Sequence, residues 1–339
     1  MIIDQLFSRA VSNGASDLHL TVGKPPVLRV HGRLLEQDDL DILTAEQLDK
    51  IIRPLLSPTQ EITLQMEKEL GLSITVPSGE RLRINIYWER GCLGLVARVV
   101  PKVVPTPEEL GLPSAVSNLS RLNEGLVLVT GPVGSGKSST LAALINEINH
   151  TRAVNIITLE DPVEYVFEQD QSLIKQRELG IDFLSYDSAL RNVLRQDVNV
   201  LMMGELRDLE TIGAAVTLAE TGHLIFATLH TANAAQTINR LIDVFPADQQ
   251  NQIRLQLSLT LRAIISQHLV PAKSGGGRVG LFELLLNNPA IANLMRENKV
   301  AQVPTIMEMS LREGMMTMRQ HAHELVKQGK VERESVVLS

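Results

Sequence analysis

The sequence predicts an α/β protein with two domains, and three observations support this prediction. In residues 114–286, short and nearly unbroken apolar runs alternate with segments of helical periodicity, as a parallel sheet covered on both faces requires. In residues 1–100, polar and apolar residues alternate with period two, which predicts half-buried strands. Between these regions, three prolines stand within residues 101–107. We interpret residues 101–113 as a semi-rigid linker.

The first domain, residues 1–100, is expected to contain strands at 26–35 and 81–87, where the alternation is clearest. Arg81 and Arg83 are two residues apart, so they should project from one face of their strand. Arg98 lies in the strand expected next along the chain.

The second domain, residues 114–286, is expected to contain strands at 126–130, 154–159, 198–203 and 223–228, with helices between them. A further strand is predicted at 278–286. Apolar residues at helical spacing from Ile253 to Ile265 predict one long helix there. Residues 287–339 are expected to form a helical tail, with Pro289 near the start of its first helix.

Composition narrows the classes of function. The 339 residues are 44% hydrophobic, which is enough for a substantial core, and they carry a net charge of -7 with only 3% aromatic residues. A negative charge and few stacking side chains disfavour nucleic acid as a partner. The single cysteine, Cys92, excludes a disulfide within the chain and a zinc site built of cysteines alone, so no zinc is expected. We see no signal peptide and no apolar run long enough to span a bilayer, and we expect a cytoplasmic protein.

A phosphate-binding loop lies between an apolar run and an amphipathic helix, so the motif and its context agree. In such a loop, backbone N–H groups converge on phosphates at the positive end of a helix. Lys137 is expected to neutralise the β and γ oxygens of ATP, and Ser138 to offer its hydroxyl to Mg²⁺. The motif therefore predicts a magnesium-dependent ATPase. Its candidate nucleotide-binding residues are Gly131, Pro132, Val133, Gly134, Ser135, Gly136, Lys137, Ser138 and Ser139.

Carboxylates follow two of the predicted strands at the sheet edge where open parallel sheets bind ligands. We assign Glu205 to Mg²⁺ and its water shell, and Glu164 to positioning the attacking water, although the two roles can be exchanged. Either carboxylate alone is also compatible with a helix cap or a surface ion pair, but the placement of both at this edge disfavours that alternative.

Two histidines flank the last predicted strand of the parallel set. His230 is expected to contact the γ-phosphate and so to distinguish ATP from ADP, and His223 to support the same region. The alternative is that each histidine only satisfies backbone groups at a strand end.

These residues resemble one family, the secretion ATPases of type II secretion and type IV pili, and within it the branch that retracts pili. The resemblance covers nearly the whole chain. Near residue 205 this chain has Gly-Glu where P-loop enzymes more often have Asp, which matches the family. The segments that carry the resemblance are 15–20 (Ala-Ser-Asp-Leu-His-Leu), 25–30, the phosphate-binding loop, 159–164 (Leu-Glu-Asp-Pro-Val-Glu), 204–212 and 221–231.

The resemblance implies a PAS-like first domain, a RecA-like second domain with a parallel-rich sheet, and a homohexamer with Mg²⁺ and ATP bound between domains. It also implies that arginines of the first domain reach the γ-phosphate, for which Arg81, Arg83 and Arg98 are the candidates. Strand-face arginines are otherwise usually just solvated. Expected partners are an inner-membrane pilus platform protein, through which the chain would associate peripherally with that membrane, and a paralogous motor ATPase.

Two further features bear on which branch the chain resembles. Assembly and type II secretion ATPases typically carry a four-cysteine zinc motif, which this chain cannot form, and this favours retraction. Residues 290–297 resemble an element of retraction ATPases, but Ala292 stands where that element has its first arginine. The segment is equally compatible with an amphipathic packing helix.

The sequence thus favours a hexameric motor for pilus retraction and twitching motility. Three alternatives remain open. They are an assembly, secretion or DNA-transfer ATPase of the same family without the zinc motif, a non-hydrolysing ATP-binding regulator of a paralogous motor, and a RecA-like DNA motor, which the acidic balance weakens.

Overall fold

The computed structural model describes residues 2–30, 32–76, 79, 81–100, 103–275 and 277–336, with the side chain of Ile2 left out. The chain divides into two compact units. The amino-terminal unit comprises residues up to Val103, and the carboxyl-terminal unit comprises most of the residues from Val104 on.

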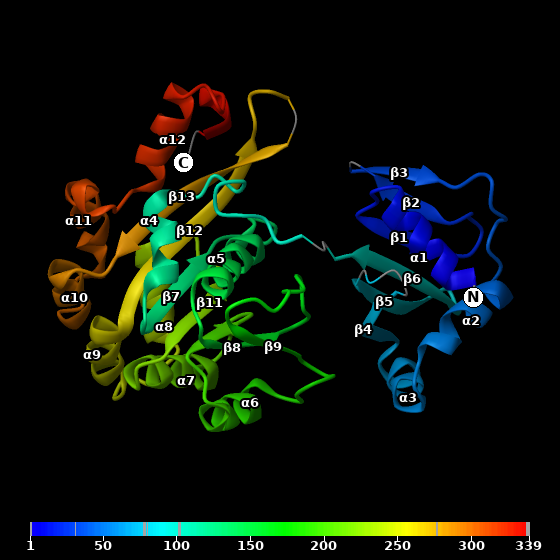
Figure 1. The fold of residues 1–339 in the computed structure, drawn as a ribbon, viewed down its shortest axis with the longest axis horizontal. Coiled ribbons are helices and arrows are strands. Elements are labelled where there is room, and N and C mark those ends of the chain that lie inside the picture. Colours follow the sequence, from blue (N-terminus) through cyan, green and yellow to red (C-terminus); the bar gives the residue numbers. More distant parts are fainter. Residues whose placement is uncertain are drawn as a thin grey trace. The chain divides into compact units, whose positions relative to one another are not determined.

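The amino-terminal unit contains an antiparallel sheet, whose six strands among the described residues are arranged in the order β3-β2-β1-β6-β5-β4 (Figure 1). The strands are β1 (Asp17–Leu20), β2 (Val27–Val30), β3 (Arg33–Glu36), β4 (Glu69–Thr75), β5 (Arg81–Glu89) and β6 (Cys92–Val99). Its helices are α1 (Ile2–Ser12), α2 (Ala45–Ile52) and α3 (Pro58–Glu67).

Alternation of side chains gives this sheet one apolar face. In β5, Leu82, Ile84 and Ile86 are fully buried, while Arg83 and Asn85 are exposed, as the period-two pattern predicted. The buried side chains pack with Phe7 from α1 and with Leu48, Ile51 and Ile52 from α2. The opposite face of β5 and β6 carries the charged residues.

The carboxyl-terminal unit is built on a mostly parallel sheet, which confirms the predicted α/β fold class. Its seven described strands are arranged in the order β13-β12-β7-β11-β10-β8-β9, and only the β12–β13 pair is antiparallel. The strands are β7 (Gly125–Thr130), β8 (Asn155–Glu160), β9 (Leu173–Glu178), β10 (Val200–Met203), β11 (Leu224–Leu229), β12 (Leu261–Pro271) and β13 (Arg278–Leu286). Figure 1 shows the long β12–β13 pair in yellow.

Helices cover both faces of this sheet. Leu126 and Leu128 of β7 join the core formed with α6 to α11, whereas Val127 and Val129 point to the other face, where α5 packs against β7. The helices are α4 (Ser114–Ser117), α5 (Lys137–Thr151), α6 (Tyr186–Val193), α7 (Leu209–Glu220), α8 (Ala234–Asp243), α9 (Gln250–Thr260), α10 (Pro289–Arg296), α11 (Val303–Met309) and α12 (Met318–Lys327). Short 3-10 helices lie at η1 (Arg53–Leu55), η2 (Asn118–Arg121), η3 (Leu194–Gln196), η4 (Val300–Gln302), η5 (Leu311–Glu313) and η6 (Arg333–Val336).

The prediction of one long helix from Ile253 to Ile265 is wrong. Helix α9 ends at Thr260, and the chain continues directly as strand β12. Strand β12 lies between β7 and β13, so Ala263, Ile264 and Ile265 are all fully buried. A continuous apolar run buried on both faces of a sheet has no period-two signal, and periodicity alone cannot separate it from a buried helix. Strand β12 passes beside the end of β7, where the phosphate-binding loop begins.

In the described parts of the chain, no helix reaches the length and apolar character that crossing a bilayer requires.

Candidate nucleotide-binding site

The phosphate-binding loop joins the end of β7 to the start of α5. Two of its glycines are required, Gly131 by the main chain that lies against it and Gly136 mainly by its own backbone conformation. A β carbon at Gly131 would lie 2.2 Å from the main-chain oxygen of Gln267, and one at Gly136 would lie 2.8 Å from Nε2 of Gln267. Both glycines also have positive φ, 141° and 89°. Side chains at these positions would displace the loop, so its shape depends on glycine at both ends.

The start of α5 offers an environment for an anion. Gly136 is the N-cap and makes no side-chain cap bond, so the first N–H groups of a 15-residue helix face the loop with the positive end of the helix dipole. Ser135 is 3% exposed, and within the described residues its hydroxyl has no hydrogen-bond partner. Donors gathered at a helix N-terminus fit a phosphate group.

Lys137 lies at the first position of α5 and is only 8% exposed. Its Nζ donates to the main-chain oxygens of Gly131 at 2.9 Å and Pro132 at 3.0 Å, and it lies 3.3 Å from Nδ1 of His230. An ammonium group has donors only, so Nδ1 of His230 must be the acceptor. The charge of Lys137 is therefore held at the loop, and His230 lies directly beside it.

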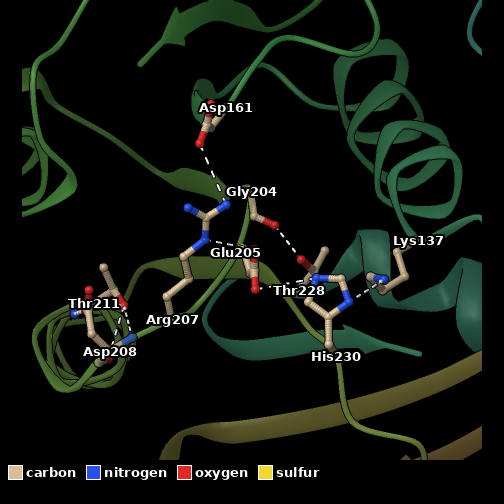
Figure 2. A network of polar contacts seen from close by, with 9 residues as sticks. All are labelled: Lys137, Asp161, Gly204, Glu205, Arg207, Asp208, Thr211, Thr228 and His230. Carbon is tan, nitrogen blue, oxygen red and sulfur yellow. Dashed lines mark hydrogen bonds and ion pairs between the residues drawn. The ribbon is translucent and has the colours of Figure 1, made fainter. Parts of the chain in front are cut away.

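His230 connects Lys137 to Glu205. With Nδ1 accepting, the proton of the neutral imidazole is assigned to Nε2, which lies 3.4 Å from Oε1 of Glu205. Figure 2 shows His230 between Lys137 and Glu205, with Arg207 approaching the same carboxylate from another side. Nε of Arg207 donates to Oε2 of Glu205 at 2.9 Å. The structure thus brings three of the predicted site residues, Lys137, Glu205 and His230, into one polar network.

The ends of three strands hold this network in place. The main-chain N–H of Gly204, just after β10, donates to the oxygen of Leu159 in β8 at 2.9 Å, and Leu206 N–H donates to Thr228 of β11 at 3.0 Å. The Thr228 hydroxyl donates to the oxygen of Gly204 (Figure 2). These hydrogen bonds fix the main chain on both sides of Glu205.

Arg207 joins the Glu205 loop to the acidic loop after β8. Its guanidinium lies 3.7 Å from the carboxylate of Asp161, and its hydrogen bond to Glu205 raises the pKa of Arg207 above its ordinary value. Tyr186 of α6 lies nearby, and burial, together with the charges of Asp161, Glu160 and Glu205, raises the pKa of its hydroxyl to about 12. Tyr186 is therefore neutral at physiological pH.

The acidic loop contains both buried and exposed carboxylates. Glu160 ends β8, is 6% exposed, and accepts hydrogen bonds from Thr158 at 2.6 Å and Gln176 at 3.1 Å. The carboxylate of Glu178 accepts from the N–H of Val163 at 3.0 Å, which ties the loop to β9. Glu164 is exposed in the loop that follows. Its role as the residue that positions water stays a prediction.

The donor set fits a hard cation. Ser138 occupies the first turn of α5 next to Lys137, and the carboxylate of Glu205 is 27% exposed beside the same lysine network. Hydroxyl and carboxylate oxygens are the ligand types that Mg²⁺ prefers. Ser138 and Glu205 would hold the ion.

The prediction that His223 supports the phosphate region is wrong. His223 precedes β11, and its main-chain oxygen accepts from Gly125 at the start of β7. Its ring contacts the Thr221 hydroxyl at 3.0 Å and the oxygen of Leu218 at 3.1 Å. Because β7 and β11 are parallel, His223 lies at the amino edge of the sheet and the phosphate-binding loop lies at the carboxyl edge. The ring of His223 contacts the turn at the end of α7.

The three candidate arginines lie on the charged face of the amino-terminal sheet. Arg83 and Arg98 are directly paired across β5 and β6. Nε of Arg98 donates to Asp17 at 2.8 Å. Burial would raise the pKa of Asp17, but hydrogen bonds from Arg98 and Ser16 hold that pKa below its ordinary value. Arg81 stands two residues from Arg83 on the same strand, so the predicted common face of the arginines is formed.

Sequence reasoning assigned no role to Arg207, Thr228 or Gln267. Arg207 lies two residues after Glu205, and this spacing could have indicated that the two side chains contact each other in the same loop. Thr228 and Gln267 reach the site only through strand order, and the stretch before Gln267 was predicted as helix.

A family model described as "Type II/IV secretion system protein" matches residues 108–338. The chain belongs to this family. Among curated members, it is 43% identical over 335 residues to the type IV pilus retraction ATPase PilT of Pseudomonas aeruginosa, covering 99% of this chain and 97% of that protein. It is also 43% identical to a twitching motility protein of Neisseria gonorrhoeae, over 91% of this chain and 83% of that protein.

Among solved structures of this family, the crystal structure of the pilus retraction motor PilT with bound ADP superposes with a TM-score of 0.93. It is 44% identical and covers 99% of this chain and 96% of the other. The predicted family and fold class are therefore confirmed.

Proposed function

We propose that this chain is a magnesium-dependent ATPase that drives the retraction of type IV pili. The observation that carries the proposal is the Lys137–His230–Glu205 network beside the phosphate-binding loop. The chain's similarity to PilT extends over nearly its whole length and includes this site.

The residues divide the chemistry as follows. The N–H groups of the loop and the ammonium of Lys137 bind the phosphates of ATP, and Ser138 and Glu205 hold Mg²⁺. Bound Mg²⁺ supplies positive charge at the β and γ oxygens. Glu164 positions and polarises the attacking water, although Glu205 and Glu164 can exchange these roles. His230 lies between Lys137 and Glu205, and this position supports its proposed contact with the γ-phosphate.

The proposed assembly is a homohexamer whose active sites are completed between subunits. Arg81, Arg83 and Arg98 then contribute positive charge toward the γ-phosphate, where developing negative charge must be neutralised. The paired arrangement of Arg83 with Arg98, oriented by Asp17, supports a common target for these guanidinium groups. Closure and opening around nucleotide would convert hydrolysis into movement of the subunits.

The proposed partners are an inner-membrane platform protein of the pilus and a paralogous motor ATPase. The chain would act in the cytoplasm and associate with the inner membrane through the pilus machinery. No nucleic acid and no zinc are part of the proposal.

Deletion of the gene in its own organism tests the proposed direction of movement. Cells that lack the protein are expected to carry excess surface pili that do not retract, and to lose twitching motility. Pili counted by electron microscopy and retraction followed in live cells provide the measurement, with complementation by the wild-type gene as the control. Complete absence of pili would instead identify an assembly ATPase of the same family.

A further inference from the structure

Strand β12 runs directly beside the strand that leads into the phosphate-binding loop. Its Ser266 is paired in parallel register with Thr130, the last residue of β7. The hydroxyl of Thr130 donates to that of Ser266 at 3.0 Å, and both residues are fully buried. The next residue of β12, Gln267, therefore arrives where the loop begins.

Gln267 contacts the loop at both ends and also contacts α5. It is 4% exposed. Its main-chain oxygen occupies the space that a β carbon at Gly131 would need, and its Nε2 occupies that space at Gly136. Its Oε1 accepts a hydrogen bond of 2.7 Å from the hydroxyl of Thr140, a fully buried residue in the first turn of α5.

We propose that Gln267 is a positioning residue for nucleotide binding, which fixes the phosphate-binding loop against the start of α5. The inference rests on the proposed ATPase function, and Gln267 itself is assigned no contact with the nucleotide. The loop binds phosphate through N–H groups that must converge before the ligand arrives. The side chain of Gln267 fills the space opposite Gly136, and its bond to Thr140 fixes where that side chain lies.

The physical consequence of losing this side chain is specific. Thr140 would retain a buried hydroxyl without its acceptor, and the side chain at position 267 would no longer be held against Gly136, so the loop would be less firmly fixed in its phosphate-binding conformation. Both effects oppose nucleotide binding. Neither removes a group that acts on the γ-phosphate, so affinity should fall more than the rate of the chemical step.

The test replaces Gln267 with methionine, which keeps an unbranched side chain of similar length and removes both amide atoms. The Kd for Mg-ADP, measured by calorimetry on the full-length protein, is expected to rise about tenfold, and KM for ATP with it, while kcat changes by less than about twofold. Gln256→Met is the matched control. Gln256 lies on α9 and bonds to Glu220 at 2.8 Å, so this variant should bind nucleotide as the wild type does.

A second variant removes the same hydrogen bond from the other side. Thr140→Val keeps the volume of the side chain and should raise Kd in the same direction. The Kd of the double variant for Mg-ADP should be no higher than the higher Kd of the two single variants, because each single change already removes the one hydrogen bond that the two residues share. The melting temperature of each variant, measured without nucleotide, distinguishes a variant that does not fold from a folded variant that binds nucleotide weakly.

Equal Kd values for the wild type and a folded Gln267→Met variant would overturn the inference while leaving the ATPase function intact. An effect on kcat alone, or full additivity in the double variant, would also overturn it. If the wild type itself binds no nucleotide, the proposed function fails first and this inference fails with it.

Discussion

Replacing Lys137 with alanine is expected to abolish ATP hydrolysis, with turnover reduced at least about a hundredfold. Lys137 is the buried cation at the start of α5, and its ammonium lies within hydrogen-bond distance of two loop oxygens and His230. No other side chain of the described network offers a positive charge inside the loop. Alanine removes the charge that neutralises the β and γ oxygens and also frees the loop oxygens that Lys137 holds together.

Steady-state release of phosphate by purified protein at saturating Mg-ATP measures this effect. Lys175→Ala is the matched control, since Lys175 is exposed on β9 of the same unit and should tolerate the change. A melting temperature close to that of the wild type would show that the Lys137 variant is folded. Turnover within about threefold of wild type in the Lys137 variant would contradict the assigned role.

Glu205→Gln is expected to bind ATP and to hydrolyse it about 10²- to 10⁴-fold more slowly, whether the carboxylate holds Mg²⁺, as assigned, or polarises the attacking water in the exchanged role. The change is nearly isosteric. Glutamine retains an oxygen that can accept from Nε of Arg207, so the polar network beside Thr228 and Gly204 should survive. The negative charge facing His230 and the proposed Mg²⁺ position is lost. Binding and turnover should therefore separate in this variant.

Titration with Mg²⁺ distinguishes the two possible roles of Glu205. If Glu205 mainly holds the ion, high Mg²⁺ should restore much of the turnover. If it polarises water, turnover should remain low at any Mg²⁺ concentration. Glu164→Gln, measured in parallel, should show the complementary behaviour, because the two glutamates are assigned the two roles between them.

The control for this pair is Glu210→Gln, which makes the same change at an exposed position in the first turn of α7. It should leave turnover unchanged. Wild-type turnover in Glu205→Gln at ordinary Mg²⁺ would exclude this residue from both roles and would leave its network with Arg207 and His230 as a structural feature only.

Much of the fold was predictable because its signals are local. The period-two pattern of β5 and the apolar runs of β7, β8, β10 and β11 each reflect the burial of that segment alone. Strand β9 was not predicted. It lies at the edge of the sheet, its sequence Leu-Ile-Lys-Gln-Arg-Glu is mostly polar, and only its pairing with β8 makes it a strand. Strand β12 was predicted as helix because burial on both faces erases the pattern that separates the two.

In the candidate site too, the residues with a local sequence signal were predictable, and those placed by strand order were not. The glycines, Lys137 and Glu205 were predictable because each lies just after a recognisable strand, and parallel strands bring their carboxyl ends to one edge. His223 was predicted wrongly because a residue before a strand reaches the opposite edge from one after it. The role of Gln267 could not be predicted from the sequence, because its place beside Gly131 and Gly136 depends on the position of β12 next to β7.

The central claim is that this chain hydrolyses Mg-ATP in sites completed between subunits. The most direct measurement is Mg²⁺-dependent ATP hydrolysis by the purified protein across a wide range of protein concentration, with Lys137→Ala as the blank. The account predicts a specific activity that rises with protein concentration and reaches a plateau as the ring assembles. Turnover independent of concentration would leave the ATPase but would not support, over that range, sites assembled from separate subunits, and no turnover above the blank at any concentration would contradict the claim as a whole.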